Sequence, residues 1–108
     1  MQIEFIRNEN TLCTEVKCIY GTSAPSATIK LEIRDKNNTR LYIKEITDDV
    51  TIHATDERKY SLYEYCLPVG EIYNLYADIS TAYESGNKTL TITPIFEFSH
   101  LIEQTATP

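Results

Sequence analysis

The stretch Leu67–Ile79 constrains the fold of this chain most, because a break in the backbone there is followed by strict alternation. Pro68 has no amide donor, and Gly70 permits a bend that a residue with a Cβ would resist. After the break, four alternate residues share one apolar face: Tyr73, Leu75, Ala77 and Ile79. Alternation with a period of two over seven residues predicts a half-buried β-strand.

The same alternation recurs in short runs separated by turn-forming residues. We expect eight strands, at residues 2–6, 12–20, 28–34, 41–43, 50–54, 60–67, 73–79 and 89–98. Residues 35–39 and 84–88 are rich in Asp, Asn and Gly and predict hairpin turns, whereas residues 55–59 predict a charged turn. No window shows a sustained helical period, so the pattern predicts an all-β antiparallel sandwich of two sheets, with a small jelly roll or partly open barrel as the alternative.

Length and charge limit the classes of protein to which this chain can belong. The 108 residues fit one domain, which we place at residues 1–98, followed by a tail or linker start at 99–108. A net charge of −6 argues against binding to nucleic acid or to an anionic membrane surface. No apolar run approaches the roughly 20 residues that span a bilayer, and residues 1–6 do not resemble a signal peptide. We therefore expect either an intracellular chain or a mature or excised piece.

The three cysteines, Cys13, Cys18 and Cys66, are too few and odd in number for a disulfide scaffold. We expect three reduced thiols, although one disulfide with one free thiol stays open. Alternation places Cys18 on the inward side of its strand, where we expect a structural role.

No residue pattern predicts catalysis or a cofactor. The C-x4-C spacing of Cys13 and Cys18 does not match the tight pairs of structural zinc sites, and His53 and His100 are scattered. There is no glycine-rich elbow for a nucleophile. The adjacent acidic pairs at 48–49 and 56–57 fall in predicted turns, where a calcium site is an alternative to plain solvation. We expect no enzyme activity and no cofactor.

Eight tyrosines and no tryptophan suggest a recognition surface. Tyrosine offers a large contact area at low entropy cost, although cross-strand tyrosine pairs also stabilise sheets. We expect four tyrosines to project from a sheet face towards a partner: Tyr42, Tyr63, Tyr65 and Tyr76. The partner would be a protein, in a homo- or hetero-oligomer, or else a glycan that stacks on the rings.

A tyrosine directly after a glycine turn, as at Gly70 and Tyr73, is similar to the tyrosine corner of immunoglobulin-like sandwiches. Residues 26–98 resemble fibronectin type III and other immunoglobulin-like domains, which implies a sandwich of seven or eight strands with structural roles for Pro68, Gly70 and Tyr73. Residues 28–35, 70–79 and 93–98 are also similar to the N-terminal sandwich of phage baseplate upper proteins. That family implies a virion structural role without enzyme activity, in a module that anchors a receptor-binding assembly to the tail.

Together these patterns favour a non-catalytic interaction module of a virion or of a multi-domain surface protein. Edge strands such as Gln2–Ile6 would offer unpaired backbone groups to a neighbouring subunit. A carbohydrate-binding module that uses exposed tyrosines is the alternative.

Overall fold

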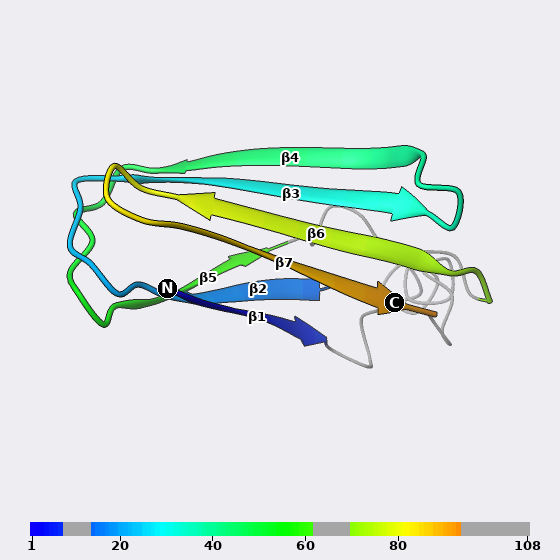
Figure 1. The fold of residues 1–108 in the computed structure, drawn as a ribbon, viewed down its shortest axis with the longest axis horizontal. Helices are drawn as coiled ribbons and strands as arrows, with labels where there is room; N and C mark the ends of the chain where they lie inside the picture. Colours follow the sequence, from blue (N-terminus) through cyan, green and yellow to red (C-terminus); the bar gives the residue numbers. More distant parts are fainter. Residues whose placement is uncertain (8–13, 62–69, 94–108) are drawn as a thin grey trace, which may run out of the picture.

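The computed structural model describes residues 1–7, 14–61 and 70–93, which form seven strands in two antiparallel sheets (Figure 1). One sheet has three strands in the order β1-β2-β5, and the other has four in the order β4-β3-β6-β7. The strands are β1 (Gln2–Arg7), β2 (Thr14–Ile19), β3 (Ala27–Asp35), β4 (Arg40–Asp48), β5 (Glu57–Ser61), β6 (Tyr73–Ser80) and β7 (Ser85–Ile92). The described residues contain no helix. This confirms the all-β architecture with two antiparallel sheets.

The core lies where the alternating apolar residues of both sheets meet. The most buried members of the four-stranded sheet come from its two central strands: Ile29, Leu31 and Ile33 of β3, and Leu75, Ala77 and Ile79 of β6. Val16, Cys18 and Tyr60 are the buried side chains of β2 and β5. Complete burial of a large aliphatic side chain contributes about 1.5–3 kcal/mol, so this alternation determines which face of each strand points inward. The predicted inward position of Cys18 is confirmed.

The β3–β4 hairpin forms at the predicted residues 35–39. Asp35 Oδ1 accepts hydrogen bonds from the backbone N–H groups of Asn37 and Thr39, both at 2.9 Å. Asn38 adopts a φ of +67°, a left-handed conformation that asparagine tolerates. A register shift between Ile33 and Arg34 marks a bulge beside this turn.

The segment between β4 and β5 differs from the prediction. Residues 50–54 are not a strand, because Ile52 makes only an isolated bridge with Ala24. The chain reverses at Thr55, where φ is +74°. β5 then begins at Glu57, inside the predicted charged turn, since the charged side chains of Glu57 and Lys59 occupy the exposed face of that strand.

The β6–β7 turn lies earlier than predicted, because β7 already begins at Ser85. Thr81 forms this turn: its hydroxyl oxygen accepts the backbone N–H groups of Tyr83 and Glu84, both at 3.1 Å. Gly86 therefore lies in the strand. A Cβ atom at Gly86 would stand 3.2 Å from Ile3 Cδ1, so the glycine permits β7 to approach β1 closely.

Side-chain contacts connect the two sheets at both ends of their strand order. Beside β7, the Glu84 carboxylate lies 3.2 Å from the Met1 amino group and accepts backbone N–H groups of Gly21 and Thr22. Beside β4, Lys44 Nζ donates to the Ser61 carbonyl of β5 at 2.9 Å.

Candidate interaction surface

Of the four tyrosines predicted to project towards a partner, the structure places Tyr76 on the face of the four-stranded sheet that points away from the core, called here the outer face. The prediction that Tyr42 projects outward is wrong. Tyr42 pairs with the buried Ile33, so the alternation of β4 turns it inward, where it packs half-buried against the core. Tyr63 and Tyr65 lie outside the described residues, as does Pro68.

The other two structural candidates lie at the start of β6. Gly70 adopts a φ of +82°, which a residue with a Cβ rarely adopts, so the bend predicted there is present. Tyr73 is buried at 6% exposure and packs with Ile33, Leu75 and Ile92.

The outer face carries a group of four interacting side chains, Glu32, Arg34, Arg40 and Tyr76, called here the arginine cluster. Glu32 Oε1 lies 3.3 Å from Arg34 Nη2 and 3.5 Å from Arg40 Nη1. The Arg34 guanidinium also stacks over the Tyr76 ring, 4.5 Å from its centroid. Asn38 Oδ1 accepts from both Arg34 Nη1 and the Tyr76 hydroxyl.

Strand register assembles this cluster, because Glu32 stands opposite Tyr76 on one side and opposite Ile43 on the other. The neighbours cover Glu32 so well that it is only 7% exposed, although alternation predicts a solvated side chain. A buried carboxylate normally requires charged partners, and here both arginines supply them. The sequence feature that could have indicated this cluster is a glutamate and an arginine two residues apart, because alternation places both on the same face of one strand.

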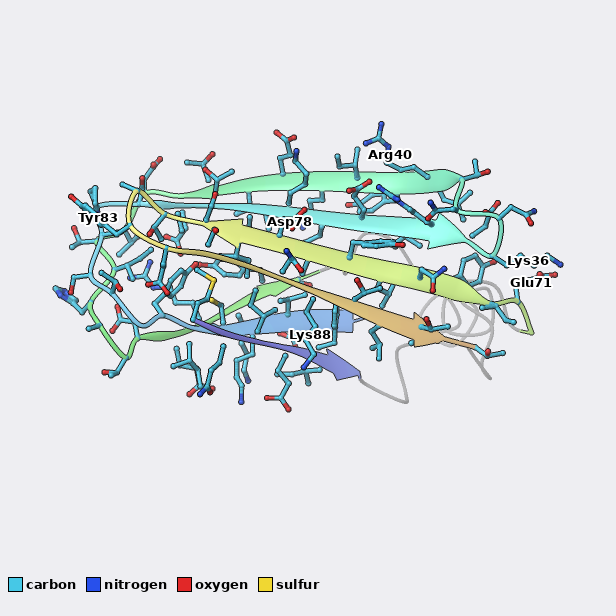
Figure 2. The ribbon with its side chains drawn as sticks, in the orientation of Figure 1. Lys36, Arg40, Glu71, Asp78, Tyr83 and Lys88 are labelled. Atoms are coloured by element: carbon cyan, nitrogen blue, oxygen red, sulfur yellow. The ribbon has the colours of Figure 1, made fainter. Side chains whose placement is uncertain are left out.

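Exposed apolar side chains lie beside the cluster. Ile43 is 40% exposed on the outer face, and Leu41, the additional residue at the bulge, is 41% exposed. Figure 2 shows Arg40 projecting from β4, away from the three-stranded sheet. Tyrosine and arginine are enriched among the energetically important residues of protein interfaces, and the exposed aliphatic side chains beside them add apolar area that a partner could bury.

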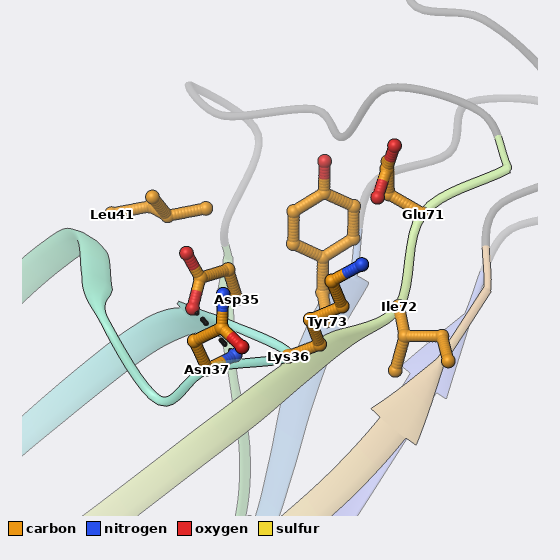
Figure 3. Close-up of a pocket in the computed structure, with 7 residues that line it drawn as sticks. All are labelled: Asp35, Lys36, Asn37, Leu41, Glu71, Ile72 and Tyr73. Carbon is orange, nitrogen blue, oxygen red and sulfur yellow. Dashed lines mark hydrogen bonds between the residues drawn. The ribbon is translucent and has the colours of Figure 1, made fainter.

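A cavity of about 260 Å³ opens at the hairpin end of the same sheet (Figure 3). Its lining is mixed: Asp35, Lys36, Asn37, Leu41, Glu71, Ile72 and Tyr73. One carboxylate oxygen of Asp35 already accepts two backbone hydrogen bonds within the β3–β4 turn. The cavity is slightly smaller than the sites that typically enclose a small molecule.

A second polar group lies between the sheets and connects Tyr20, Tyr60, Asp48 and Arg58. The Tyr60 hydroxyl donates to Asp48 Oδ2 at 2.8 Å and lies 2.8 Å from the Tyr20 hydroxyl. Arg58 Nη1 lies 2.9 Å from the same Asp48 oxygen. The single hydroxyl proton of Tyr60 is donated to Asp48, so in the hydrogen bond between the two phenols the Tyr20 hydroxyl is the donor.

Burial and hydrogen bonding fix the charges of this group. Burial raises the pKa of Tyr20 to about 12 and moves the pKa of Tyr60 further upward. Burial also opposes ionisation of Asp48, but hydrogen bonds from Arg58, Tyr60 and the Val50 N–H outweigh it and lower the pKa of that carboxyl. Both raised values keep the phenols protonated near neutral pH, so they act in this group as neutral hydrogen-bond partners that connect the two sheets.

Cys18 and the acidic side chains were the sequence candidates for thiol chemistry and metal binding. Burial raises the pKa of the Cys18 thiol to about 11, which keeps it protonated and weakly nucleophilic. Within residues 1–7, 14–61 and 70–93, no group of three or more His, Cys, Asp or Glu side chains could hold a metal ion. The same ranges contain no helix long and apolar enough to cross a membrane.

No protein-family model matches the chain, and no curated protein matches its sequence. The arginine cluster, with Ile43 beside it, is the most distinctive surface feature of the described residues.

Proposed function

We propose that this domain is a non-catalytic protein-interaction module, which binds its partner through the outer face of the four-stranded sheet around Ile43 and the arginine cluster. The observation that carries the proposal is the stack of Arg34 on Tyr76 beside the exposed Ile43. Arginine and tyrosine provide strong contacts at protein interfaces, and the adjoining isoleucine offers apolar area that a partner could bury.

Preorganisation supports the proposal further. Arg34 contacts Glu32, Asn38 and Tyr76 at once, so its long side chain is already ordered. Immobilising a side chain with many rotamers costs about 0.5–1.5 kcal/mol when a complex forms. A surface that is ordered before binding avoids part of that cost.

The setting that we propose is a structural component of a larger assembly, of the virion or the multi-domain surface-protein type. This setting extends the resemblance noted above for residues 28–35, 70–79 and 93–98, and the scaffold of two packed sheets is compatible with it. β1 lies at the edge of its sheet, as expected, but its Ile3 packs beside Gly86 of β7. The outer face of the other sheet carries the arginine cluster and the exposed Ile43, and it is the surface that we propose for contact with a neighbouring subunit.

Glycan binding has less support. A sugar ring stacks on the open face of an aromatic side chain, and Arg34 covers one face of Tyr76. Tyr42 is turned towards the core. Tyr83 is 67% exposed, at the β6–β7 turn, but stands apart from the residues of the arginine cluster.

Partner capture with matched variants tests the proposal. Wild-type protein, Ile43→Lys and Tyr83→Ala would be immobilised at equal density and exposed to extract of the source organism or its virions. We expect a specific protein that the wild type and Tyr83→Ala retain equally, and that Ile43→Lys retains about tenfold less, since a central apolar contact contributes at least 1.4 kcal/mol. Equal retention by all three proteins, or no retained protein, would contradict the proposal.

A further inference from the structure

The arginine cluster contains more positive than negative charge. Two guanidinium groups, those of Arg34 and Arg40, share one oxygen of Glu32, at 3.3 and 3.5 Å. Each arginine carries a full positive charge at neutral pH, whereas Glu32 supplies one negative charge. The Glu32 side chain is about nine-tenths buried, so water screens these charges less than it would on an open surface. The cluster therefore has one uncompensated positive charge.

The spare capacity for hydrogen bonding lies on Arg40. Among the described contacts, this arginine uses only Nη1, towards Glu32, and its side chain is 56% exposed. Arg34, by contrast, uses Nη1 for Asn38 and Nη2 for Glu32, and its buried Nε has no hydrogen-bond partner among the described residues. Nε and Nη2 of Arg40 thus have no hydrogen-bond partner among the described residues. A guanidinium edge of this kind can bind a carboxylate through two parallel hydrogen bonds.

We infer that the arginine cluster is a recognition site for a carboxylate side chain of a protein partner. Arg40 would donate two hydrogen bonds to that carboxylate, and Ile43 would contact apolar atoms of the partner next to it. This inference rests on the proposed function and specifies the chemistry of the partner. The ideal segment carries a glutamate or aspartate next to aliphatic residues, because Ile43 stands directly opposite Glu32 in the sheet. The incoming carboxylate completes a network of two guanidinium and two carboxylate groups.

Charge selects a carboxylate over a phosphate. The uncompensated charge of the cluster is one unit, which matches a single carboxylate, whereas a phosphate monoester carries nearly two negative charges. The same sheet face also carries Glu45, which is exposed and lies near Lys30, and the exposed Asp78. These carboxylates oppose a dianion more strongly than a monoanion.

Peptide titration of isotope-labelled protein, followed by nuclear magnetic resonance, tests the inference. The probes are three capped peptides: acetyl-Ser-Ile-Glu-Leu-Ser-amide, the same peptide with glutamine for glutamate, and the same peptide with phosphoserine for glutamate. We expect the glutamate peptide to shift the amide resonances of Arg34, Arg40 and Ile43, and to bind about tenfold more tightly than the glutamine peptide. Arg40→Gln should abolish this preference, whereas Lys59→Gln, which removes an exposed cation on the other sheet, should preserve it.

Three results would overturn the inference: equal binding of the glutamate and glutamine peptides, tighter binding of the phosphoserine peptide, or shifts confined to other parts of the protein. The capture experiment with Ile43→Lys depends on no carboxylate. A module that recognises only apolar side chains of its partner would lose capture in Ile43→Lys but would bind the glutamate and glutamine peptides equally. That pair of results would refute the inference and leave the proposed function supported.

Discussion

Tyr60 of β5 and Asp48 of β4 join the two sheets through a hydrogen bond of 2.8 Å between the phenol and the carboxylate. The same carboxylate oxygen lies 2.9 Å from Arg58. Tyr20 extends the contact further into the core, where its hydroxyl lies 2.8 Å from that of Tyr60. A continuous series of hydrogen bonds between largely buried side chains therefore connects the two sheets on this side of the sandwich.

Removal of the Tyr60 hydroxyl should destabilise the fold. We expect Tyr60→Phe to lower the free energy of unfolding by about 1–3 kcal/mol, because Tyr20 loses its acceptor and Asp48 loses a donor within a buried group. Urea denaturation followed by circular dichroism measures this change. Tyr83→Phe is the matched control, and its effect should stay within about 0.5 kcal/mol because Tyr83 is exposed. Equal effects of the two variants would refute the role assigned to Tyr60.

The free energy of unfolding should fall in acid because of Asp48. Its pKa is lower in the folded protein than in the unfolded chain, so its contribution is complete above the unfolded pKa of about 4. The contribution is lost as pH decreases through the lower folded value. Asp56 and Glu84 also have lowered pKa values and act in the same direction.

Asp48→Asn isolates this residue in a pH series. We expect the variant to be less stable than wild type at pH 7. The difference should shrink below pH 4, because the unfolded wild-type chain takes up a proton at Asp48 there, and should be smallest once the folded carboxyl is protonated as well. Urea denaturation at each pH from 7 to 2 measures both curves. A difference that stays constant over this range would show that ionisation of Asp48 does not contribute.

The thiol of Cys18 should be inert in the folded protein. Cys18 is completely buried, and burial raises its pKa to about 11, so very little thiolate exists at pH 8. In a Cys13→Ser and Cys66→Ser background, we expect no reaction with Ellman's reagent in buffer and complete reaction in guanidinium chloride. Rapid labelling of the native protein would contradict the placement of Cys18 in the core.

Gly70 should resist replacement because of its backbone conformation. Its φ is +82°, and, chain neighbours aside, no atom of the described residues lies within 4 Å of the position that a Cβ would occupy. We therefore expect the cost of a substitution to come from the dihedral angle. We expect Gly70→Ala to lower the free energy of unfolding by about 1–2 kcal/mol, and Gly70→Asn to cost less, since asparagine tolerates a positive φ. Thermal denaturation by calorimetry compares the two variants, and an equal cost would refute this explanation.

Alternation predicted most of the sandwich because one face of each central strand is buried. The inward residues Ile29, Leu31 and Ile33 follow directly from the sequence of β3, as does Leu75 from that of β6. The predicted strand boundaries were wrong where a side-chain hydrogen bond, and not a typical turn residue such as glycine, reverses the direction of the chain. Thr81 forms the β6–β7 turn through its hydroxyl, so Gly86 falls within a strand although glycine usually suggests a turn.

The candidate surface was only partly predictable. Tyr76 follows from the alternation of β6, but Tyr42 required the register of β4 against β3, which depends on the bulge at Arg34. Glu32 and Arg40 were missed because the sequence does not show that the hairpin returns Arg40 to the side of Glu32. The burial of Glu32 is a consequence of that return.

Oxidative footprinting of the partner complex tests most directly whether the outer face is the interface. Hydroxyl radicals modify exposed side chains, and mass spectrometry would compare the isolated domain with the domain in its captured complex or assembly. We predict strong protection of Ile43 and Tyr76, with Val50 and Tyr83, which are 68% and 67% exposed, modified equally in both states. Unchanged modification of Ile43 and Tyr76, with protection of the three-stranded sheet instead, would contradict this account.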